Sequence, residues 1–206
     1  MPNVTAPAGG SMTQTHAWAR LGADLLTYTR AAVALYIAAM AWREAPLPAL
    51  HGIVILALVG WSTDLFDGPL ARYSGTPPSR IGLLDMWVDL LLHWCTALAL
   101  ALAGWVPLWA LAGWAAGFAL THHFHPTVTV RLGFAAPLAA LPIGFTLLRD
   151  PPLAQLFLLW LGAVLLLRHR RLPELIAEFV AGLPAPARAF FDRVLPHWIG
   201  GQRGVG

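Results

Sequence analysis

Long apolar runs separated by short polar breaks dominate the chain. The breaks carry Pro, Gly or Arg, residue types that end helices or stay outside the hydrocarbon. Several runs have about the shortest length that crosses a bilayer as a helix. The pattern predicts an all-α integral membrane bundle of six transmembrane helices, at approximately residues 24–42, 48–70, 81–104, 106–122, 132–148 and 152–168.

Both ends of the chain differ from this apolar middle. Residues 1–15 are rich in Pro, Gly, Ser and Thr, which predicts a flexible leader, and no short apolar run with a cleavage site marks a signal peptide. From residue 172 onward, apolar residues mix with Glu, Asp and Arg, as in helices that lie on a membrane surface. The expected organisation is a leader (1–15), a six-span domain (16–171) and an amphipathic cytoplasmic tail (172–206), with short interfacial helices near 18–20, 173–181 and 185–195.

Composition supports the membrane assignment. Hydrophobic residues make up 58% of the chain and charged residues 11%, about half the charge of a typical soluble protein. The formal charge of +3 comes from Arg alone and is scattered between apolar runs, which argues against a nucleic-acid partner. The single cysteine, Cys95, excludes an intrachain disulfide and a multi-Cys zinc site.

The distribution of Arg predicts the orientation. Alternate ends of the six runs differ in positive charge, and Arg is retained on the cytoplasmic side of membranes. If both termini are cytoplasmic, the outer ends hold only Arg43 and Arg149, each beside an acid. Trp42, Trp105 and Trp109 then fall near the outer interface. The inner ends hold Arg20, Arg72, Arg80, Arg131, Arg168, Arg170 and Arg171.

Four aspartates stand out in the apolar middle. A charged carboxylate at the centre of a membrane helix costs about 2.5–3.5 kcal/mol, so four together indicate a functional site. On a helix, positions i, i+3, i+4, i+7 and i+8 share one face, and the first two acids share theirs with small residues and an Arg. A second helix carries the other two acids one turn apart, after a short loop with Pro77-Pro78. The two sets are Asp64, Asp67, Gly68, Ala71 and Arg72, then Asp85 and Asp89.

The residue types in this arrangement favour a metal-bound diphosphate. Clustered carboxylates repel one another unless cations lie between them, and all-oxygen ligands prefer Mg²⁺, Mn²⁺ or Ca²⁺ to zinc. Paired metal ions stabilise the attacking and leaving oxygens of a phosphoryl transfer. Gly68 and Ala71 leave room for a ligand beside the helix, and Arg72 offers a fork of donors to phosphate. The alternative is that the acids pair with Arg30, Arg72 and Arg80 as structural ion pairs, or line a water-filled vestibule.

The spacing resembles the signature of the CDP-alcohol phosphotransferase family, Asp-x2-Asp-Gly-x2-Ala-Arg-x8-Gly-x3-Asp-x3-Asp. The four Asp, the first Gly, the Ala and the Arg match over about 26 residues. The second Gly is expected at position 81, where this chain has Ile81 followed by Gly82. Upstream, Thr27-x2-Arg30 is similar to the family's Asn-x-Leu-Thr-x2-Arg, with Asp24 in place of Asn.

The resemblance implies an enzyme of phospholipid biosynthesis that transfers a substituted phosphate from a CDP-alcohol to a second alcohol and releases CMP. Two Mg²⁺ or Mn²⁺ ions would be held by Asp64, Asp67, Asp85 and Asp89, with Asp89 also the general base for the acceptor hydroxyl. Asp64 and the group Gly68, Ala71 and Arg72 would bind the CDP portion. The usual donor of the family is CDP-diacylglycerol, and its members are commonly homodimers, for which Gly113-x3-Gly117 offers a packing face.

Several polar residues remain open to two interpretations. Arg30 either extends to the headgroups or binds substrate phosphate, and Arg80 either holds a charged acceptor or marks the cytoplasmic side. His93 follows Asp89 by one turn, as a partner of the site or as a buried histidine. At the end of the fourth run, a group of histidines forms an interfacial loop or, with Arg131, an acceptor pocket; the group is His122, His123 and His125.

Two other functions fit parts of the pattern. An intramembrane prenyltransferase uses Asp-rich motifs and Mg²⁺ but needs more spans than 206 residues supply. A divalent-metal carrier would need polar residues that continue towards the outer face, whereas the acids here gather at one end. The acceptor alcohol stays open, and the expected location is a prokaryotic plasma membrane with the site and both termini cytoplasmic.

Overall fold

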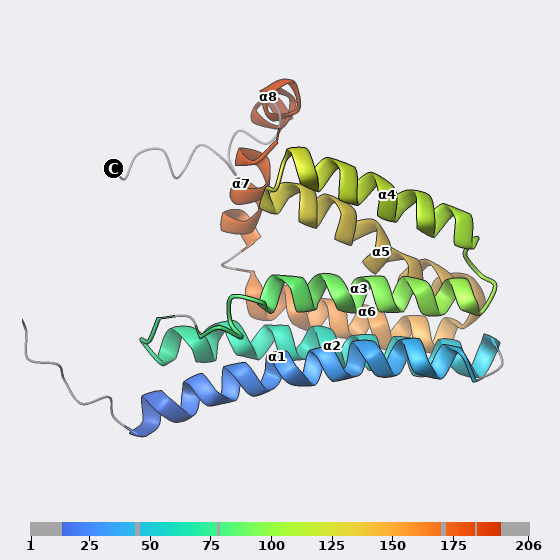
Figure 1. The fold of residues 1–206 in the computed structure, drawn as a ribbon, viewed down its shortest axis with the longest axis horizontal. Coiled ribbons are helices and arrows are strands. Elements are labelled where there is room, and N and C mark those ends of the chain that lie inside the picture. The colour runs from blue at the N-terminus through green and yellow to red at the C-terminus, as the bar shows by residue number, and fades with distance from the viewer. Residues whose placement is uncertain (1–13, 44–45, 78, 170–171, 184, 195–206) are drawn as a thin grey trace, which may run out of the picture.

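The structure is a computed structural model that describes residues 14–43, 46–77, 79–169, 172–183 and 185–194. These residues contain eight helices (Figure 1). No strand occurs in these residues, so the all-α prediction is confirmed. Most of the expected leader, 1–13, and Arg170, Arg171 and 195–206 lie outside the described residues. The helices are α1 (Gln14–Ala41), α2 (Pro46–Tyr73), α3 (Asp85–Leu102), α4 (Leu108–Phe124), α5 (Val128–Arg149), α6 (Pro151–Arg168), α7 (Leu172–Ala181) and α8 (Ala185–Val194).

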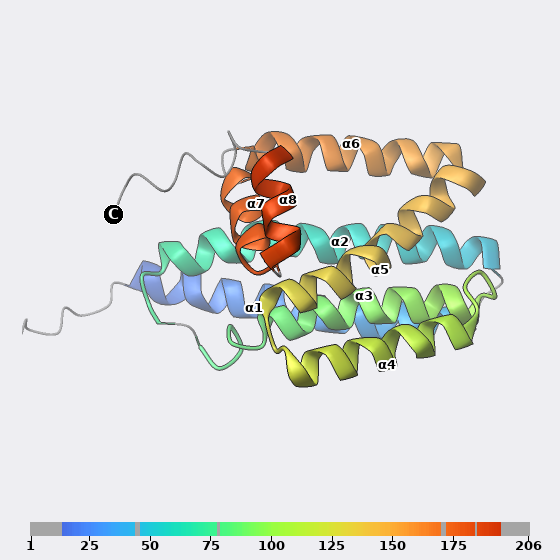
Figure 2. The same ribbon diagram turned by 90° about the horizontal axis from the view of Figure 1, so that it is seen from above.

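The first six helices run up and down, so their ends gather at two poles of the bundle. α1 packs along α2 and α3, and α6 runs beside α2 (Figures 1 and 2). α5, which contains Pro137 and Pro142, crosses diagonally between α4 and α6 (Figure 2). The pole that holds the end of α2 also holds the starts of α1, α3 and α5 and the ends of α4 and α6 (Figure 1). We call this end the site pole.

The core between α1, α2, α3 and α6 is built from small and branched apolar residues. Ala34, Ala57 and Ala99 are buried, and small side chains let helix backbones approach closely. At Gly60 of α2, an added Cβ would lie 2.7 Å from Cδ2 of the fully buried Leu92 of α3. α2 and α3 therefore approach each other closely at Gly60.

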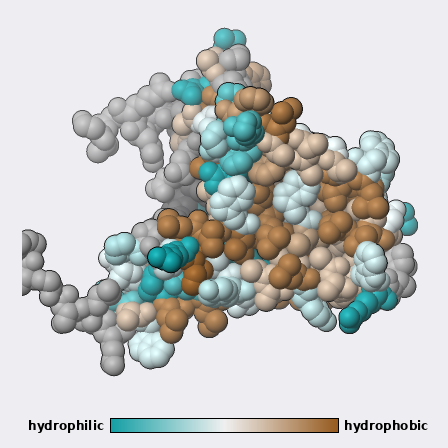
Figure 3. Space-filling view, viewed as in Figure 1, coloured by the Kyte–Doolittle hydropathy of each residue, from teal (hydrophilic) through white to brown (hydrophobic). Residues whose placement is uncertain are grey.

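Among the residues that the structure describes, four helices are long and apolar enough to cross a membrane: α3, α5, α6 and the part of α2 from Leu50 to Tyr73. Many of their leucines face outward, including Leu148, Leu159 and Leu166, and apolar side chains cover much of the bundle's flank (Figure 3). Several apolar helices with apolar outer faces are compatible with a multi-pass membrane protein. α4 has 17 residues, and the polar residues of α1, such as Asp24 and Arg30, lower its hydropathy.

Several helix ends differ from the expected spans; α5, for example, begins at Val128 rather than at residue 132. The segment at 18–20 is not a separate interfacial helix, because α1 continues without a break from Gln14. The third helix begins at Asp85 rather than at residue 81, because residues 80–84 form turns. The expected tail helices are present as α7 and α8.

The arginines divide between the poles as the charge pattern predicted. The starts and ends of helices at the site pole carry Arg20, Arg72, Arg131 and Arg168, and the turn before α3 carries Arg80. The opposite pole carries Arg43 and Arg149, together with Trp42, Trp105 and Trp109. All four site aspartates belong to the Arg-rich pole.

Candidate functional site

The four aspartates come from two neighbouring helices. Asp64 and Asp67 lie on the last turns of α2, and Asp85 and Asp89 lie on the first turns of α3. One carboxylate oxygen from each of Asp64, Asp67 and Asp85 lies within 4.8 Å of the others. The side chain of Asp67 is only 7% exposed, whereas those of the other three are 34–41% exposed. The predicted convergence is therefore present for three of the four carboxylates, whereas Asp89 is not part of this group.

Arg30 of α1 lies at the centre of these carboxylates. Its side chain is fully buried. Nη2 donates to Asp67 and lies 3.8 Å from Asp64 Oδ1, while Nη1 donates to Asp85 Oδ1 (3.0 Å) and to Asp89. Of the sequence-based alternatives for Arg30, extension to the lipid headgroups is wrong, because the guanidinium points inward to the acids.

The Arg30 side chain is also anchored on its inner side. Nε donates to Thr63 Oγ1 at 3.2 Å, and the Thr63 hydroxyl donates to the backbone oxygen of Gly60 at 2.7 Å. A guanidinium with contacts at all three nitrogens has little freedom to leave. The positive charge is therefore a fixed part of the site.

Two further residues contact the acids, and sequence reasoning gave neither a role here. Thr27 Oγ1 of α1 lies 3.2 Å from Asp85 Oδ1. Arg168, at the end of α6, donates from Nη2 to the backbone oxygen of Asp64 (2.8 Å), and its Nη1 lies 3.8 Å from Asp64 Oδ2. The sequence marked Thr27 only through the family resemblance and Arg168 only as a topology signal, because the approach of α6 to α2 is a tertiary feature.

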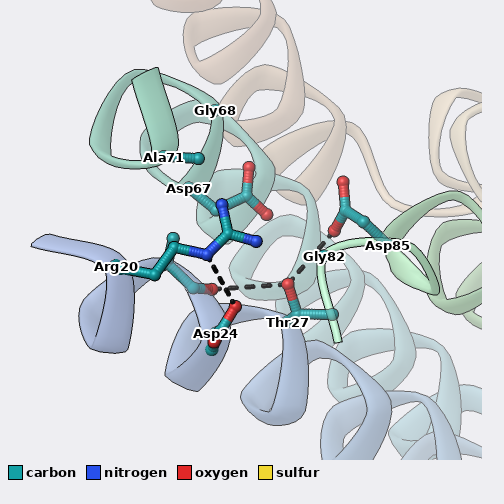
Figure 4. Close-up of a pocket in the computed structure, with 9 residues that line it drawn as sticks. Arg20, Asp24, Thr27, Asp67, Gly68, Ala71, Gly82 and Asp85 are labelled. Atoms are coloured by element: carbon teal, nitrogen blue, oxygen red, sulfur yellow. Dashed lines mark hydrogen bonds and ion pairs between the residues drawn. The ribbon is translucent and has the colours of Figure 1, made fainter. Parts of the chain in front are cut away.

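A cavity of about 160 Å³ adjoins the carboxylates (Figure 4). Its wall is formed by α1, α2, the turn before α3 and the first residue of α3, and it includes four positions with glycine or alanine. The structure places Gly82, not Ile81, in this wall. The lining residues are Arg20, Ala23, Asp24, Thr27, Asp67, Gly68, Ala71, Gly82 and Asp85.

Gly82 lies in close contact with the Arg20 side chain of α1. A Cβ at this position would overlap Nη2 of Arg20, so the end of that side chain would have to move. The backbone N–H of Gly82 donates to Ser79 Oγ at 3.0 Å, and Ser79 Oγ also accepts from Arg20 Nη2 at 3.1 Å. The Ser79 hydroxyl in turn donates to Asp24 Oδ1 at 2.7 Å. This network ties the turn before α3 to α1 and brings a glycine to the cavity although it stands one residue late in the motif.

Arg72 and Gly68 lie beside each other on α2, as their spacing predicts. A Cβ at Gly68 would lie 3.3 Å from Arg72 Nη1. The exposed Arg72 guanidinium therefore lies next to Gly68, which is one of the residues that line the cavity. Arg80 is exposed in the turn before α3.

Arg131 and His122 belong to a separate aromatic cluster. The Arg131 guanidinium lies 5.4 Å from the centre of the Trp87 ring, and His122 packs edge-on against Trp87 and stacks on Phe118. Within the described residues, Arg131 Nε and His122 Nδ1 are buried without a hydrogen-bond partner. The cluster joins α3, α4 and α5 and brings one of the three histidines, His122, close to Arg131.

The remaining candidate residues have simpler positions. His93 Nδ1 donates to the backbone oxygen of Asp89 at 2.6 Å, and its ring packs against Trp61. It therefore contacts the main chain of Asp89. His123 and His125 are exposed at the end of α4. Gly113 faces open space, whereas a Cβ at Gly117 would touch Phe134 of α5, so only Gly113 is open to a partner.

The chemistry of the site follows from its charges. The four carboxylates carry a formal −4, and the guanidinium groups of Arg30 and Arg168, which contact them, reduce this to −2. These two arginines together do not neutralise the acids, so the arrangement favours cations. Comparison of the chain with known protein families, curated proteins and solved structures gives no match.

Proposed function

We propose that the chain is a membrane-embedded CDP-alcohol phosphotransferase that transfers a substituted phosphate, a phosphatidyl group in the simplest case, to an acceptor alcohol and releases CMP. One observation carries the proposal. Carboxylates from α2 and α3 converge beside a cavity lined by Gly68, Ala71 and Gly82. The proposal assigns to the chain the activity of the family whose Asp-Gly-Ala-Arg pattern it resembles.

The donor set fits Mg²⁺ or Mn²⁺. All the converging groups are carboxylate oxygens, which hard divalent cations prefer, and the formal charge of −2 leaves a cation favoured. Asp64, Asp67 and Asp85 would hold the metal, with Asp89 completing a two-metal site. Bound there, divalent cations would neutralise charge on the transferred phosphate and polarise its oxygens.

The side chains have distinct roles in the proposed reaction. Asp89 accepts the proton of the acceptor hydroxyl while the new oxygen–phosphorus bond forms and the phosphoanhydride bond to CMP breaks. Gly68 and Ala71 let the nucleotide approach α2, and Arg72 donates to its phosphates. Arg30, through its contacts with all four acids, keeps the carboxylates in place.

The proposed setting is a prokaryotic plasma membrane crossed six times. Four of the described helices are long and apolar enough by themselves to cross a membrane, and α1 and α4 would be the fifth and sixth spans. Both termini and the site pole would face the cytoplasm, where Arg is retained. CDP-diacylglycerol would enter from the lipid, the acceptor alcohol from the cytoplasm, and the protein would work as a homodimer.

A CMP-release assay tests the proposal. The purified protein in detergent is given CDP-diacylglycerol, Mn²⁺ and a panel of acceptors: glycerol 3-phosphate, inositol phosphate, serine and a lipid alcohol. We expect CMP with at least one acceptor, no CMP in excess EDTA, and a loss of at least about 100-fold in Asp89→Asn, the usual range for a general base. Asp150→Asn, at the opposite pole, is the matched control and retains activity.

The same assay separates the competing functions. Metal uptake into proteoliposomes without CMP release would support a divalent-metal carrier instead, and release of diphosphate from a prenyl diphosphate would support a prenyltransferase. Full activity in EDTA, or undiminished turnover in Asp89→Asn, would remove the proposed mechanism.

A further inference from the structure

The site contains permanent positive charges as well as four negative ones. Arginine stays protonated in proteins, so Arg30 and Arg168 contribute +2 at every accessible pH. Arg30 is fully buried and held by Thr63, and Arg168 is held by the backbone oxygen of Asp64. Both guanidinium groups are therefore held in place at the site.

These charges limit how many cations the protein can hold by itself. One divalent cation brings the group of four carboxylates and two guanidinium groups from −2 to zero. A second would bring it to +2, against the repulsion of the buried Arg30 guanidinium, which contacts the same carboxylates, and the nearby Arg72 would add repulsion of the same sign. Such repulsion is strong where the effective dielectric constant is low. Charge balance alone therefore favours one ion.

Arg30 also shares its partners with the ion. Its Nη2 contacts Asp67 and its Nη1 contacts Asp85, two of the three residues whose oxygens converge. A carboxylate has about four lone-pair sites, so both can bind Arg30 and one ion together. Asp89, the fourth acid, is bound to Arg30 but is not part of the converging group. The first ion would have three carboxylates as ligands. A second ion would have only carboxylates that it shares with Arg30 or with the first ion.

We propose that Arg30 and Arg168 set the metal content of the site, so that the protein alone binds one divalent cation and a second binds only together with the diphosphate of the substrate. This inference rests on the proposed function. The diphosphate supplies both the missing negative charge and the missing oxygen ligands. The second ion is then bound only while the substrate is bound.

Manganese titration of the full chain in detergent measures the number of bound ions, with free Mn²⁺ followed by electron paramagnetic resonance. We expect one ion per chain without nucleotide, two with saturating CDP, and one with cytidine, which has the same base and sugar but no phosphate. Two ions of comparable affinity in the absence of CDP would overturn the inference.

Charge-removing variants test the role of the arginines. Arg30→Gln lowers the formal charge of the group to −3, and we expect its affinity for a second ion without CDP to rise at least about tenfold. Arg168→Gln makes the same change in a half-buried side chain, so it keeps the test valid if Arg30→Gln does not fold. Arg43→Gln, at the opposite pole, should leave the count at one. A count of one in both site variants would contradict the inference.

Failure of the inference and failure of the proposed function have different signatures. CMP release by a protein that binds two ions without CDP would refute only the metal-content inference. The expected ion counts without CMP release from CDP-diacylglycerol under any acceptor would refute only the proposed reaction.

Discussion

Replacement of Arg30 by Met tests how much of the bundle's stability depends on one buried guanidinium. The substitution keeps an unbranched side chain but removes the charge and every donor. It abolishes the hydrogen bonds and ion pairs of Arg30 with Thr63, Asp67, Asp85 and Asp89, together with the longer approach to Asp64. Three carboxylates and one hydroxyl would lose their shared partner at once.

The expected cost can be worked from the burial of these groups. Removal of one partner from a buried ion pair costs about 3–5 kcal/mol. Only Asp67 is nearly buried here, and the other three carboxylates are about a third or more exposed, so water screens part of the repulsion that remains. We therefore expect about 3 kcal/mol, which in a chain of this size lowers the midpoint of thermal unfolding by about 6–12 °C.

The assay is thermal unfolding in detergent with EDTA, followed by circular dichroism at 222 nm. Arg30→Lys, which keeps the charge but not the planar fork, should lose less than Arg30→Met. Arg43→Met at the opposite pole is the control and should match the wild type. Addition of Mn²⁺ should restore most of the loss in Arg30→Met, because a cation then lies among the acids. Equal midpoints for Arg30→Met and the wild type in EDTA would refute the argument that Arg30 holds the carboxylates together.

Two further substitutions test the packing and the cavity. Gly60→Ala places a methyl group 2.7 Å from Cδ2 of buried Leu92, and we expect a loss of about 1–3 kcal/mol from overpacking, measured as a lower unfolding midpoint; an unchanged midpoint would show that α2 and α3 can separate at no cost. Gly68→Val fills part of the cavity, and calorimetric titration with CDP should show at least about tenfold weaker binding while Mn²⁺ still binds. Unchanged CDP affinity would place the nucleotide elsewhere.

The sequence was most informative where its signals were local. Helix positions follow from the length of apolar runs and from Pro and Gly at the breaks, and all six predicted runs correspond to helices α1 to α6. The shared faces of Asp64 and Asp67 and of Asp85 and Asp89 follow from helical periodicity. The gathering of these acids in space also agreed with expectation, because a short loop forces α2 and α3 to run antiparallel.

The helix limits were less predictable. α1 begins at Gln14 and α3 begins at Asp85, and neither limit is marked by a change in apolar content. Residues 80–84 are apolar enough to continue a span, yet they form turns held by Ser79. The difference brings Gly82 rather than Ile81 to the cavity wall. Ser79, which accepts a local hydrogen bond from the Gly82 N–H, is itself hydrogen-bonded to Arg20 and Asp24 of α1, so contacts between distant segments help to place that residue.

The sequence by itself therefore determined an all-helical, apolar chain with four acids on two adjacent helical faces. Only the tertiary structure decided that Arg30 lies among those acids, that Arg168 contacts Asp64, and that Gly82 lines the cavity. The physical reason is the range of the interactions. Periodicity and turn chemistry act over a few residues, whereas the partners of the acids come from α1 and α6. Arg30 is 34 residues and Arg168 is 104 residues away from Asp64 in the sequence. Which buried charge meets which partner depends on how whole helices pack.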